Sequence, residues 1–449
     1  MKHLFSRLSP AQKIILSFLL VIFCGSLLLS LPWVQTASSQ AGYLDHLFTA
    51  VSMVCVTGLF SLSVVDTYNV WGQLLCMLLI QIGGLGILTF IGFFTMESRK
   101  KLSLKDRRIL RDSFSYGHNR TLGQFVRSIF ITTFSIEGLG ALLLMIRFIP
   151  KFGLRKGIFN SIFLAVSAFC NAGFDNFGND SLLGLQTDVL VNITLALLII
   201  TGGLGFMVWF DLATKLGGKQ KGLHFHTKVV LLLTAGLLVF GTVTSLWTEY
   251  NNPGTIGNLS FGDKLLVSFF QTVSMRTAGF ASIDYTAARP VTLFIYLLQM
   301  FLGGAPGGTA GGLKITTFLV LLLFARKEIL GLPHTNMGRK TLSPQLVQKA
   351  FGVTVIFQLT FLLGLLALGL VTDSSHRFIY LIFETVSALA TVGVTANITT
   401  SLNTAGMIVI MLLMFIGRVG PLTLMVSLNH YQPKKAATLH YSKADIMIG

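Results

Sequence analysis

The chain has 449 residues, of which 53% are hydrophobic and only 11% are charged, and its mean hydropathy is +0.74. So few charges could not cover a water-soluble globule, so the composition excludes that class and indicates a protein that crosses a membrane several times. The formal net charge of +17 does not indicate nucleic-acid binding, because Lys and Arg are spread over several loops, where membrane topology and anionic lipid account for them.

Eight apolar segments are long enough to cross the hydrocarbon as helices, which takes about 20 residues. In chain order they lie near 14–32, 72–95, 125–149, 188–210, 229–248, 292–325, 350–371 and 405–427. Four shorter apolar segments run straight into glycine and small polar residues, at 44–57, 159–172, 265–278 and 379–392. We interpret the short segments as re-entrant half-helices that surround an aqueous path, because irregular backbone at membrane depth needs protein or water around it.

The four short segments share a pattern, seen in AVSMVCVTGLF, AVSAFCNAGFD, TVSMRTAGFAS and TVSALATVGVT. Their glycines are separated by 115, 106 and 114 residues, and a Phe and a Ser recur before each one. An internal repeat of this length implies one structural unit used four times. The sequence therefore predicts an all-α polytopic membrane protein with eight transmembrane helices and four pore half-helices around a central pore. We divide it into units at 1–96, 97–228 with a basic linker, 229–349 and 350–449.

The turns that end these segments are the candidate ion-selectivity filter. Thr391-Val392-Gly393 repeats the first three letters of the potassium-filter loop, in which four backbone segments ring an ion. Glycine reaches positive φ without steric cost, so such turns can aim carbonyl oxygens at a weakly hydrated monovalent cation, and the half-helix C-termini favour positive charge there. Close packing is the alternative for any single glycine, and the fourfold repetition favours a filter. The candidates are Val56, Thr57, Gly58, Asn171, Ala172, Gly173, Thr277, Ala278, Gly279, Thr391, Val392 and Gly393.

A second glycine-containing segment follows each turn. In units one and two, QIGGLG and TGGLG indicate close helix packing. Unit three has FLGGAPGGTAGGL, which no ordinary helix tolerates, and we expect a mobile gate there below the filter. A phosphate-binding loop is disfavoured, since the GK[ST] ending and a preceding soluble strand are missing. The candidate gate residues in this segment are Gly303, Gly304, Pro306, Gly307, Gly308, Thr309, Gly311, Gly312 and Lys314.

Four charged residues lie within apolar segments, where each needs a reason. We expect Arg418 under the filter beside the gate segment, where its charge raises the barrier for cations; snorkelling is the alternative. Glu384 is expected to hold the fourth half-helix or filter backbone by hydrogen bonds rather than to bind an ion. Arg276 is expected to brace the back of the third turn, and Glu137 receives no predicted partner.

The remaining features concern orientation and chemistry. Basic residues cluster in 96–128, 211–228 and 326–349, which places these loops and both termini in the cytoplasm. The N-terminal apolar run lacks a small-residue cleavage site, so we expect a transmembrane helix rather than a signal peptide. The four cysteines are expected to be packing thiols. We predict no enzyme activity and no covalent cofactor, because no nucleophile, metal cluster or paired carboxylate pattern is seen.

With these motifs the chain resembles the Trk/Ktr/HKT superfamily of potassium transporters, and it is most similar to the KtrB membrane subunits of Ktr uptake systems. The resemblance rests on the four filter glycines, the glycine-rich break in unit three and Arg418. It implies potassium uptake across the plasma membrane, with potassium at the filter carbonyls and a gate formed by 303–313 and Arg418. It also implies a homodimer in the lipid membrane, a cytoplasmic KtrA-type nucleotide-binding ring as partner, and stimulation by sodium.

Two alternatives stay open. The chain could be a Trk-like proton-coupled or sodium-conducting cation transporter, because a filter does not reveal thermodynamic coupling. A transporter with alternating access would usually show paired inverted repeats, whereas four repeats in parallel register favour a pore. The chain departs from the family pattern in two places, namely at Cys55 and Val56 before Thr57 and in the shorter Ser-to-Gly spacing of unit three.

Overall fold

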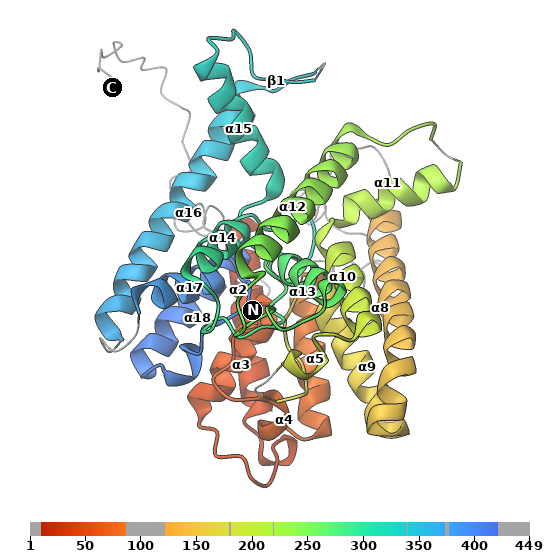
Figure 1. The fold of residues 1–449 in the computed structure, drawn as a ribbon, viewed down its shortest axis with the longest axis vertical. Helices are drawn as coiled ribbons and strands as arrows, with labels where there is room; N and C mark the ends of the chain where they lie inside the picture. The colour runs from red at the N-terminus through yellow and green to blue at the C-terminus, as the bar shows by residue number, and fades with distance from the viewer. Residues whose placement is uncertain are drawn as a thin grey trace, which may run out of the picture.

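The protein is described from a computed structural model that covers residues 10–86, 122–178, 181–218, 220–338, 340–372 and 377–420. Most of these residues are helical, which confirms the predicted all-α class (Figure 1). Their strands are β1 (Asn336–Met337) and β2 (Lys340–Thr341), which pair as a small antiparallel hairpin beyond the end of α15.

The helices follow one order four times along the chain. A long apolar helix comes first, in α2 (Pro10–Leu29), α8 (Leu122–Phe152), α12 (Phe225–Glu249) and α16 (Pro344–Val371). A short helix packs against each long one, in α3 (Tyr43–Cys55), α9 (Leu154–Phe169), α13 (Phe261–Ser274) and α17 (Phe378–Leu389). A third helix follows, in α5 (Val70–Leu85), α10 (Val189–Gly203), α14 (Pro290–Phe301) and α18 (Thr404–Val419). All four short helices end three to five residues before a candidate filter glycine.

The shorter elements complete the chain order. They are the four-residue helix α4 (Val64–Thr67), the 3-10 turns η1 (Pro32–Val34), η2 (Leu183–Leu185) and η3 (Thr399–Ser401), and two helices on one side of the molecule, α11 (Phe206–Leu216) and α15 (Ile315–Ile329). In Figure 1, α15 and α16 rise together toward the hairpin, and α11 projects outward beside the end of α8.

Polar residues mark where many of these helices begin. Asn69 accepts hydrogen bonds from the first backbone N–H groups of α5, and Asn403 does the same for α18. Ser260 and Ser343 cap α13 and α16 in this way. Such caps satisfy backbone donors that the helix itself leaves unpaired, so they fix the level at which each apolar helix starts.

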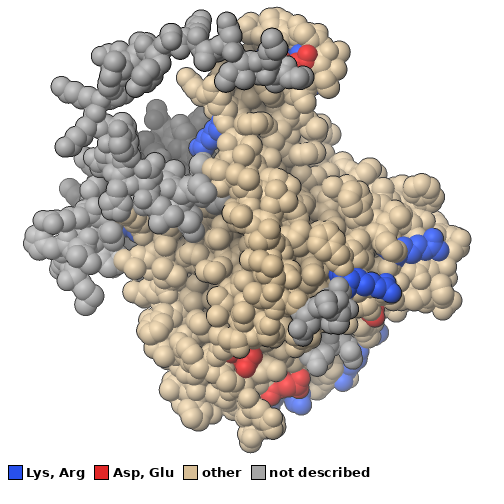
Figure 2. All heavy atoms as spheres, turned by 90° about the vertical axis from the view of Figure 1, so that its left-hand side faces the viewer, with Lys and Arg blue, Asp and Glu red and all other residues tan. Residues whose placement is uncertain are grey.

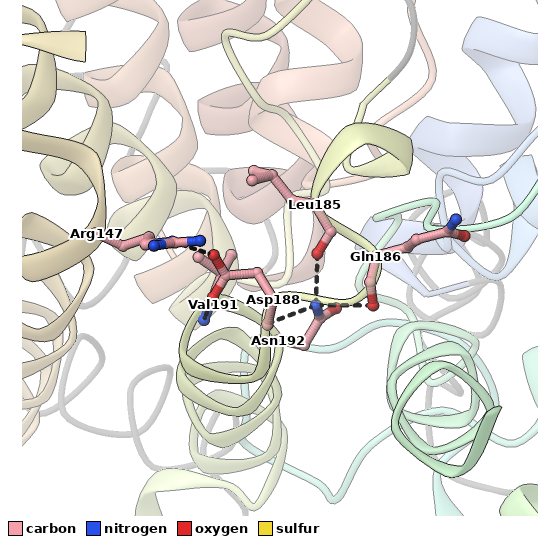
Figure 3. Close-up of polar contacts among 6 residues, drawn as sticks. All are labelled: Arg147, Leu185, Gln186, Asp188, Val191 and Asn192. Carbon is pink, nitrogen blue, oxygen red and sulfur yellow. Dashed lines mark hydrogen bonds and ion pairs between the residues drawn. The ribbon is translucent and has the colours of Figure 1, made fainter. Parts of the chain in front are cut away.

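Asp188 caps α10 and also neutralises a basic residue at that end of the unit. It accepts from the backbone N–H of Val191 and forms an ion pair with Arg147 of α8 (Figure 3). Asn192, one turn into α10, donates to the carbonyl oxygens of Leu185 at 2.8 Å and of Asp188 at 2.9 Å. Arg147 lies outside the three basic clusters predicted to face the cytoplasm, and its pairing with Asp188 offsets its charge locally.

Two of the predicted spans are broken in the structure. The segment 292–325 is divided between α14 and α15, as the glycine-rich run predicted. The segment 188–210 was predicted as one continuous span, and that prediction is wrong. There α10 ends at Gly203 and α11 begins at Phe206, with an angle of 96° between the two helices. The bend is possible because Gly205 adopts a φ of +88°, a conformation that L side chains rarely adopt.

Fewer described helices have the length and hydropathy of a transmembrane span than the eight spans predicted from the sequence. Within the described ranges, four helices are long and apolar enough to cross a membrane alone, and a fifth span results if α10 and α11 are counted together. Four shorter apolar helices are α5, α14, α17 and α18. The predicted spans 72–95 and 405–427 run past the described residues, so their far ends lie outside the structure.

The core lies where the short helices meet. The Phe that recurs in each short helix is fully buried there, at Phe48, Phe163, Phe270 and Phe383. Large apolar side chains on the outer faces are exposed instead, as are Leu139, Leu142 and Ile146 on α8. On the face shown in Figure 2, few charged side chains interrupt the part of the surface that the structure describes. An apolar exterior around a packed centre is the arrangement expected of a protein in lipid.

Candidate functional site

The four candidate filter turns share one backbone conformation. The glycines have positive φ, namely +103° at Gly58, +70° at Gly173, +83° at Gly279 and +96° at Gly393. Two residues earlier, each turn holds a second residue at positive φ, at Val56, Asn171, Thr277 and Thr391. Three of these four are β-branched, for which this conformation is costly and persists only where the surroundings impose it. The sequence predicted positive φ at the glycines and missed it at the preceding positions.

The turns meet at one point of the molecule. A Cβ atom added to Gly58 would lie 2.8 Å from the carbonyl oxygen of Ala172, and one added to Gly173 would lie 2.6 Å from the Cα of Gly279. A Cβ on Gly279 would lie 2.8 Å from the carbonyl oxygen of Val392. Gly393 in turn contacts the first turn. The four turns therefore form a closed ring in chain order, in which only hydrogen fits at the glycine positions.

The recurrent Ser of each short helix holds its turn. In units one, two and four its hydroxyl accepts from a backbone N–H, with Gly58, Phe174 and Gly393 as the donors at 3.2, 2.9 and 3.0 Å. In unit three, Ser274 donates instead to the carbonyl oxygen of Phe280 at 2.5 Å. The shorter Ser-to-Gly spacing of this unit is thus absorbed by a change of hydrogen-bond direction.

The glycine-rich segment of unit three forms a loop that is closed at its base. The backbone N–H of Gly303 donates to the carbonyl oxygen of Leu313 at 3.0 Å, and that of Ile315 donates to Gly304 at 3.2 Å. Lys314 turns back over the loop, where its ammonium donates to the carbonyl oxygen of Ala310 at 2.7 Å. The loop between α14 and α15, residues 302–314, is called the gate loop below.

The gate loop lies against the bend between α10 and α11. Backbone N–H groups of Ala305 and Thr309 donate to the carbonyl oxygens of Gly203 and Gly202 at 2.9 and 3.2 Å. In the other direction, the first N–H of α11, at Phe206, donates to the carbonyl oxygen of Gly307 at 3.0 Å. The close helix packing predicted for the unit-two glycines is seen at Gly202, which lies against the end of α9, and both glycines also contact the gate loop, which the sequence did not indicate. Gly205 is the local signal for this bend, and the prediction of one continuous span did not use it.

The gate loop also contacts three of the candidate filter turns: a Cβ added to Gly311 would meet Thr391 of the fourth turn, and hydrogen bonds join the loop to the second and third turns. Thr309 Oγ1 donates to the carbonyl oxygen of Phe169 at 3.0 Å and lies 3.2 Å from the side-chain amide of Asn171. The N–H of Gly311 donates to Thr277 Oγ1 at 3.1 Å. Side chains of the second and third turns therefore bond directly to the loop beneath them.

Arg418 connects the gate loop to the first unit. Its Nη1 donates to the carbonyl oxygen of Thr309 at 2.5 Å, and its Nη2 donates to the carbonyl oxygens of Gly83 and Gly84, the latter at 3.3 Å. All three acceptors are neutral carbonyls, so these contacts leave the positive charge of the guanidinium in place. The structure thus brings Arg418 to the loop, as the sequence predicted, and adds the carbonyls of the unit-one glycines as its other acceptors.

The other charged residues of the apolar segments have defined contacts. Glu384 accepts from the hydroxyls of Thr395, at 2.6 Å, and Thr399, so it braces the chain that leaves the fourth turn rather than the turn itself. Arg276 reaches back toward Thr234 on α12, with 3.5 Å between Nη2 and Oγ1. Glu137 accepts from Gln81 on α5, a partner that the sequence did not predict. Among the described residues, no group of His, Cys, Asp and Glu has metal-site geometry.

Comparison with known proteins shows which family has this arrangement of helices and turns. The family model for TrkH, described as a cation transport protein, matches residues 7–438. This chain belongs to the TrkH cation transport family. The predicted kinship is confirmed, and the chain is a membrane transporter rather than an enzyme.

Individual relatives of this TrkH-family chain cover nearly its whole length. It is 38% identical over 446 residues to the Ktr system potassium uptake protein B of Bacillus subtilis, covering 99% of this chain and 97% of that protein. It is 38% identical over 453 residues to the potassium/sodium uptake protein NtpJ of Enterococcus hirae, covering 100% and 99%. The crystal structure of the potassium transporter TrkH from Vibrio parahaemolyticus matches with a TM-score of 0.73 at 17% identity, over 93% of this chain and 84% of that one, which shows a shared fold.

Proposed function

We propose that this chain takes up potassium across the plasma membrane through the ring of four glycine turns. The convergence of Gly58, Gly173, Gly279 and Gly393 carries the proposal, because four turns of one conformation from four repeats meet there. Such a ring presents backbone carbonyls rather than charged groups, which suits a weakly hydrated monovalent cation. The two relatives of 38% identity are both named for potassium uptake.

The acidic residue that lies nearest to a filter turn in the sequence supports a carbonyl filter rather than a carboxylate site. Asp175 follows the second turn, and its carboxylate accepts from the hydroxyl of Ser181 at 2.7 Å and the N–H of Phe177 at 3.0 Å. These bonds hold it within its own loop. Divalent cations generally take carboxylate ligands, so the ring favours a monovalent ion.

The gate loop and Arg418 form the gate in this proposal. The loop is bonded to the second and third turns, and Arg418 on α18 donates to its Thr309 carbonyl. Conduction then requires the loop to move, and the arginine charge raises the barrier for cations while the loop is in place.

The wider assembly follows from the same resemblance. The proposal includes four units at 1–96, 97–228, 229–349 and 350–449, with eight membrane crossings, four pore half-helices and both termini in the cytoplasm. It includes a homodimer controlled by a KtrA-type nucleotide-binding ring and stimulated by sodium. The name of the Bacillus subtilis relative refers to a Ktr system, which supports a partner of this kind.

A second candidate function is transport of sodium as well as potassium, or proton-coupled transport of the Trk type. The observation that favours sodium is the name of the Enterococcus hirae relative, a potassium/sodium uptake protein.

The experiment is potassium uptake by cells that lack their own potassium transporters. The chain is expressed alone and with a KtrA-type ring, with and without sodium. Rescue at low potassium that is enhanced by ring and sodium supports the proposal. Rescue that needs neither favours an independent channel or a Trk-like relative, and sodium uptake without potassium rescue selects the second candidate.

A matched pair of glycine variants tests the ring itself. Gly393→Ala should abolish selective uptake, because its Cβ would meet the carbonyl of Thr57 at a φ of +96°. Gly352→Ala is the control, since a Cβ there meets nothing within 4 Å and Gly352 lies within helix α16. Normal potassium uptake by Gly393→Ala would place the selective ring elsewhere.

A further inference from the structure

Glu137 forms a buried polar pair between the first and second units. It lies on α8, and Gln81 on α5 donates from Nε2 to both its carboxylate oxygens, at 3.0 and 3.3 Å. The two residues are 5% and 8% exposed. The thiol of Cys170 lies 3.7 Å from Gln81 Oε1 and 3.9 Å from Glu137 Oε1. Three separate segments therefore meet in one polar cluster inside an apolar core.

Both ends of this cluster adjoin the candidate site. Cys170 directly precedes Asn171, the residue of the second turn that contacts Thr309 of the gate loop. Gln81 lies one helical turn or less from Gly83 and Gly84, whose carbonyls accept from Arg418. Gly84 itself packs on Cys170, since a Cβ there would lie 2.5 Å from the sulfur. The cluster thus lies between the start of the second turn and the acceptors of the gate arginine.

We propose that Glu137 is a positioning residue for ion selectivity, which acts through Gln81 and Cys170 to hold the second filter turn against α5. This inference rests on the proposed potassium filter. A buried amide or carboxylate that loses its partner pays the full cost of desolvation, so the pair fixes the distance between α5 and α8 tightly. Without it, α5 and the end of α9 can separate, which loosens the second turn and the carbonyls that hold Arg418.

A direct role of Glu137 as an ion ligand is disfavoured by the same contacts. Both carboxylate oxygens already accept from the amide of Gln81. One of them also faces the thiol of Cys170, the residue directly before the second turn. A permeating ion would meet turn carbonyls rather than this carboxylate.

The test is a swap of the two side chains, read as the ratio of potassium to sodium uptake per molecule in the membrane. Gln81→Glu alone puts two buried carboxylates together and should lower this ratio about tenfold. Adding Glu137→Gln to Gln81→Glu restores one amide and one carboxylate, and the ratio should return to within about twofold of the original chain. Glu137→Ala should lower the ratio as Gln81→Glu does.

Glu249→Gln is the matched control, because Glu249 is a buried carboxylate with its own network. It accepts from Thr255, between α12 and α13, at 2.6 Å and from the N–H of Arg289, between α13 and α14, at 3.0 Å. This variant should reduce the amount of protein in the membrane and leave the ion ratio unchanged.

Each outcome decides the inference. An unchanged ratio in Glu137→Ala overturns it, and so does a swap that fails to recover the ratio lost in Gln81→Glu. If the original chain transports sodium without preferring potassium, the proposed function fails instead. The swap then tests the pair through the ratio of sodium to lithium uptake, with the same pattern expected.

Discussion

Replacing Arg418 by Gln removes the bond that holds the gate loop from the side of the first unit. The guanidinium donates to the carbonyl oxygen of Thr309 at 2.5 Å, and its other bonds go to Gly83 and Gly84 on α5. Hydrogen bonds from charged groups contribute about 1.5–3 kcal/mol each. A bond made only while the loop is in place therefore favours the closed loop by roughly tenfold to a hundredfold, since each 1.4 kcal/mol is a factor of about ten.

The assay is the initial rate of potassium or rubidium uptake, normalised to the amount of protein in the membrane. We expect Arg418→Gln to raise this rate by up to the factor above, because it removes both the bond and the positive charge. Arg418→Lys separates the two effects. Lysine keeps the charge but loses the two-sided fork, so it should raise the rate less than glutamine does.

Arg326→Gln serves as the control, because Arg326 is exposed at the end of α15. Its uptake rate should match that of the original chain. An unchanged or lower rate in Arg418→Gln, at normal abundance and normal thermal stability in detergent, would refute the role of Arg418 as a barrier.

Two further predictions concern the other contacts of the gate loop. Thr309→Val removes the hydroxyl that bonds to Phe169 and contacts Asn171, so it should raise uptake severalfold. Thr309→Ser keeps the hydroxyl and should leave uptake near its original rate. Equal rates in the two variants would contradict this prediction. Gly205→Ala places a Cβ 2.7 Å from the carbonyl oxygen of Pro306 at a φ of +88°, which costs about 1 kcal/mol or more in the backbone alone. We expect Gly205→Ala to displace the loop and change the uptake rate. If the variant instead shows unchanged uptake and the same melting temperature as the original chain, the bend does not control the loop.

The sequence predicted those parts of the site whose signal lies within a few neighbouring residues. The short helices end close to where the apolar runs stopped, because a glycine and small polar residues follow each of them. The break in unit three was visible because six glycines and Pro306 fall between Gly303 and Gly312. The recurrent Ser was visible as a pattern, and the structure explains it by a bond to each turn.

The parts that escaped prediction depend on contacts between distant segments. The bend at Gly205 has a single glycine as its local signal, and the gate loop that packs against it lies about a hundred residues further along the chain. The acceptors of Arg418 on α5 are more than 330 residues away in sequence. Glu137 lacked a partner because Gln81 belongs to another repeat. Periodicity within one segment carries no information on such pairs.

Thr309 ties the candidate filter and the candidate gate to each other. Its hydroxyl bonds to the end of α9 just before the second turn, its N–H bonds to Gly202, and its carbonyl accepts from Arg418. One residue of the loop therefore contacts units two and four at once, so the loop cannot leave the path while these bonds persist. Since the hydroxyl also contacts Asn171, movement of the loop changes the support of the second turn. Opening and selectivity should thus vary together, and a Thr309→Val variant with faster uptake should also discriminate less well between potassium and sodium.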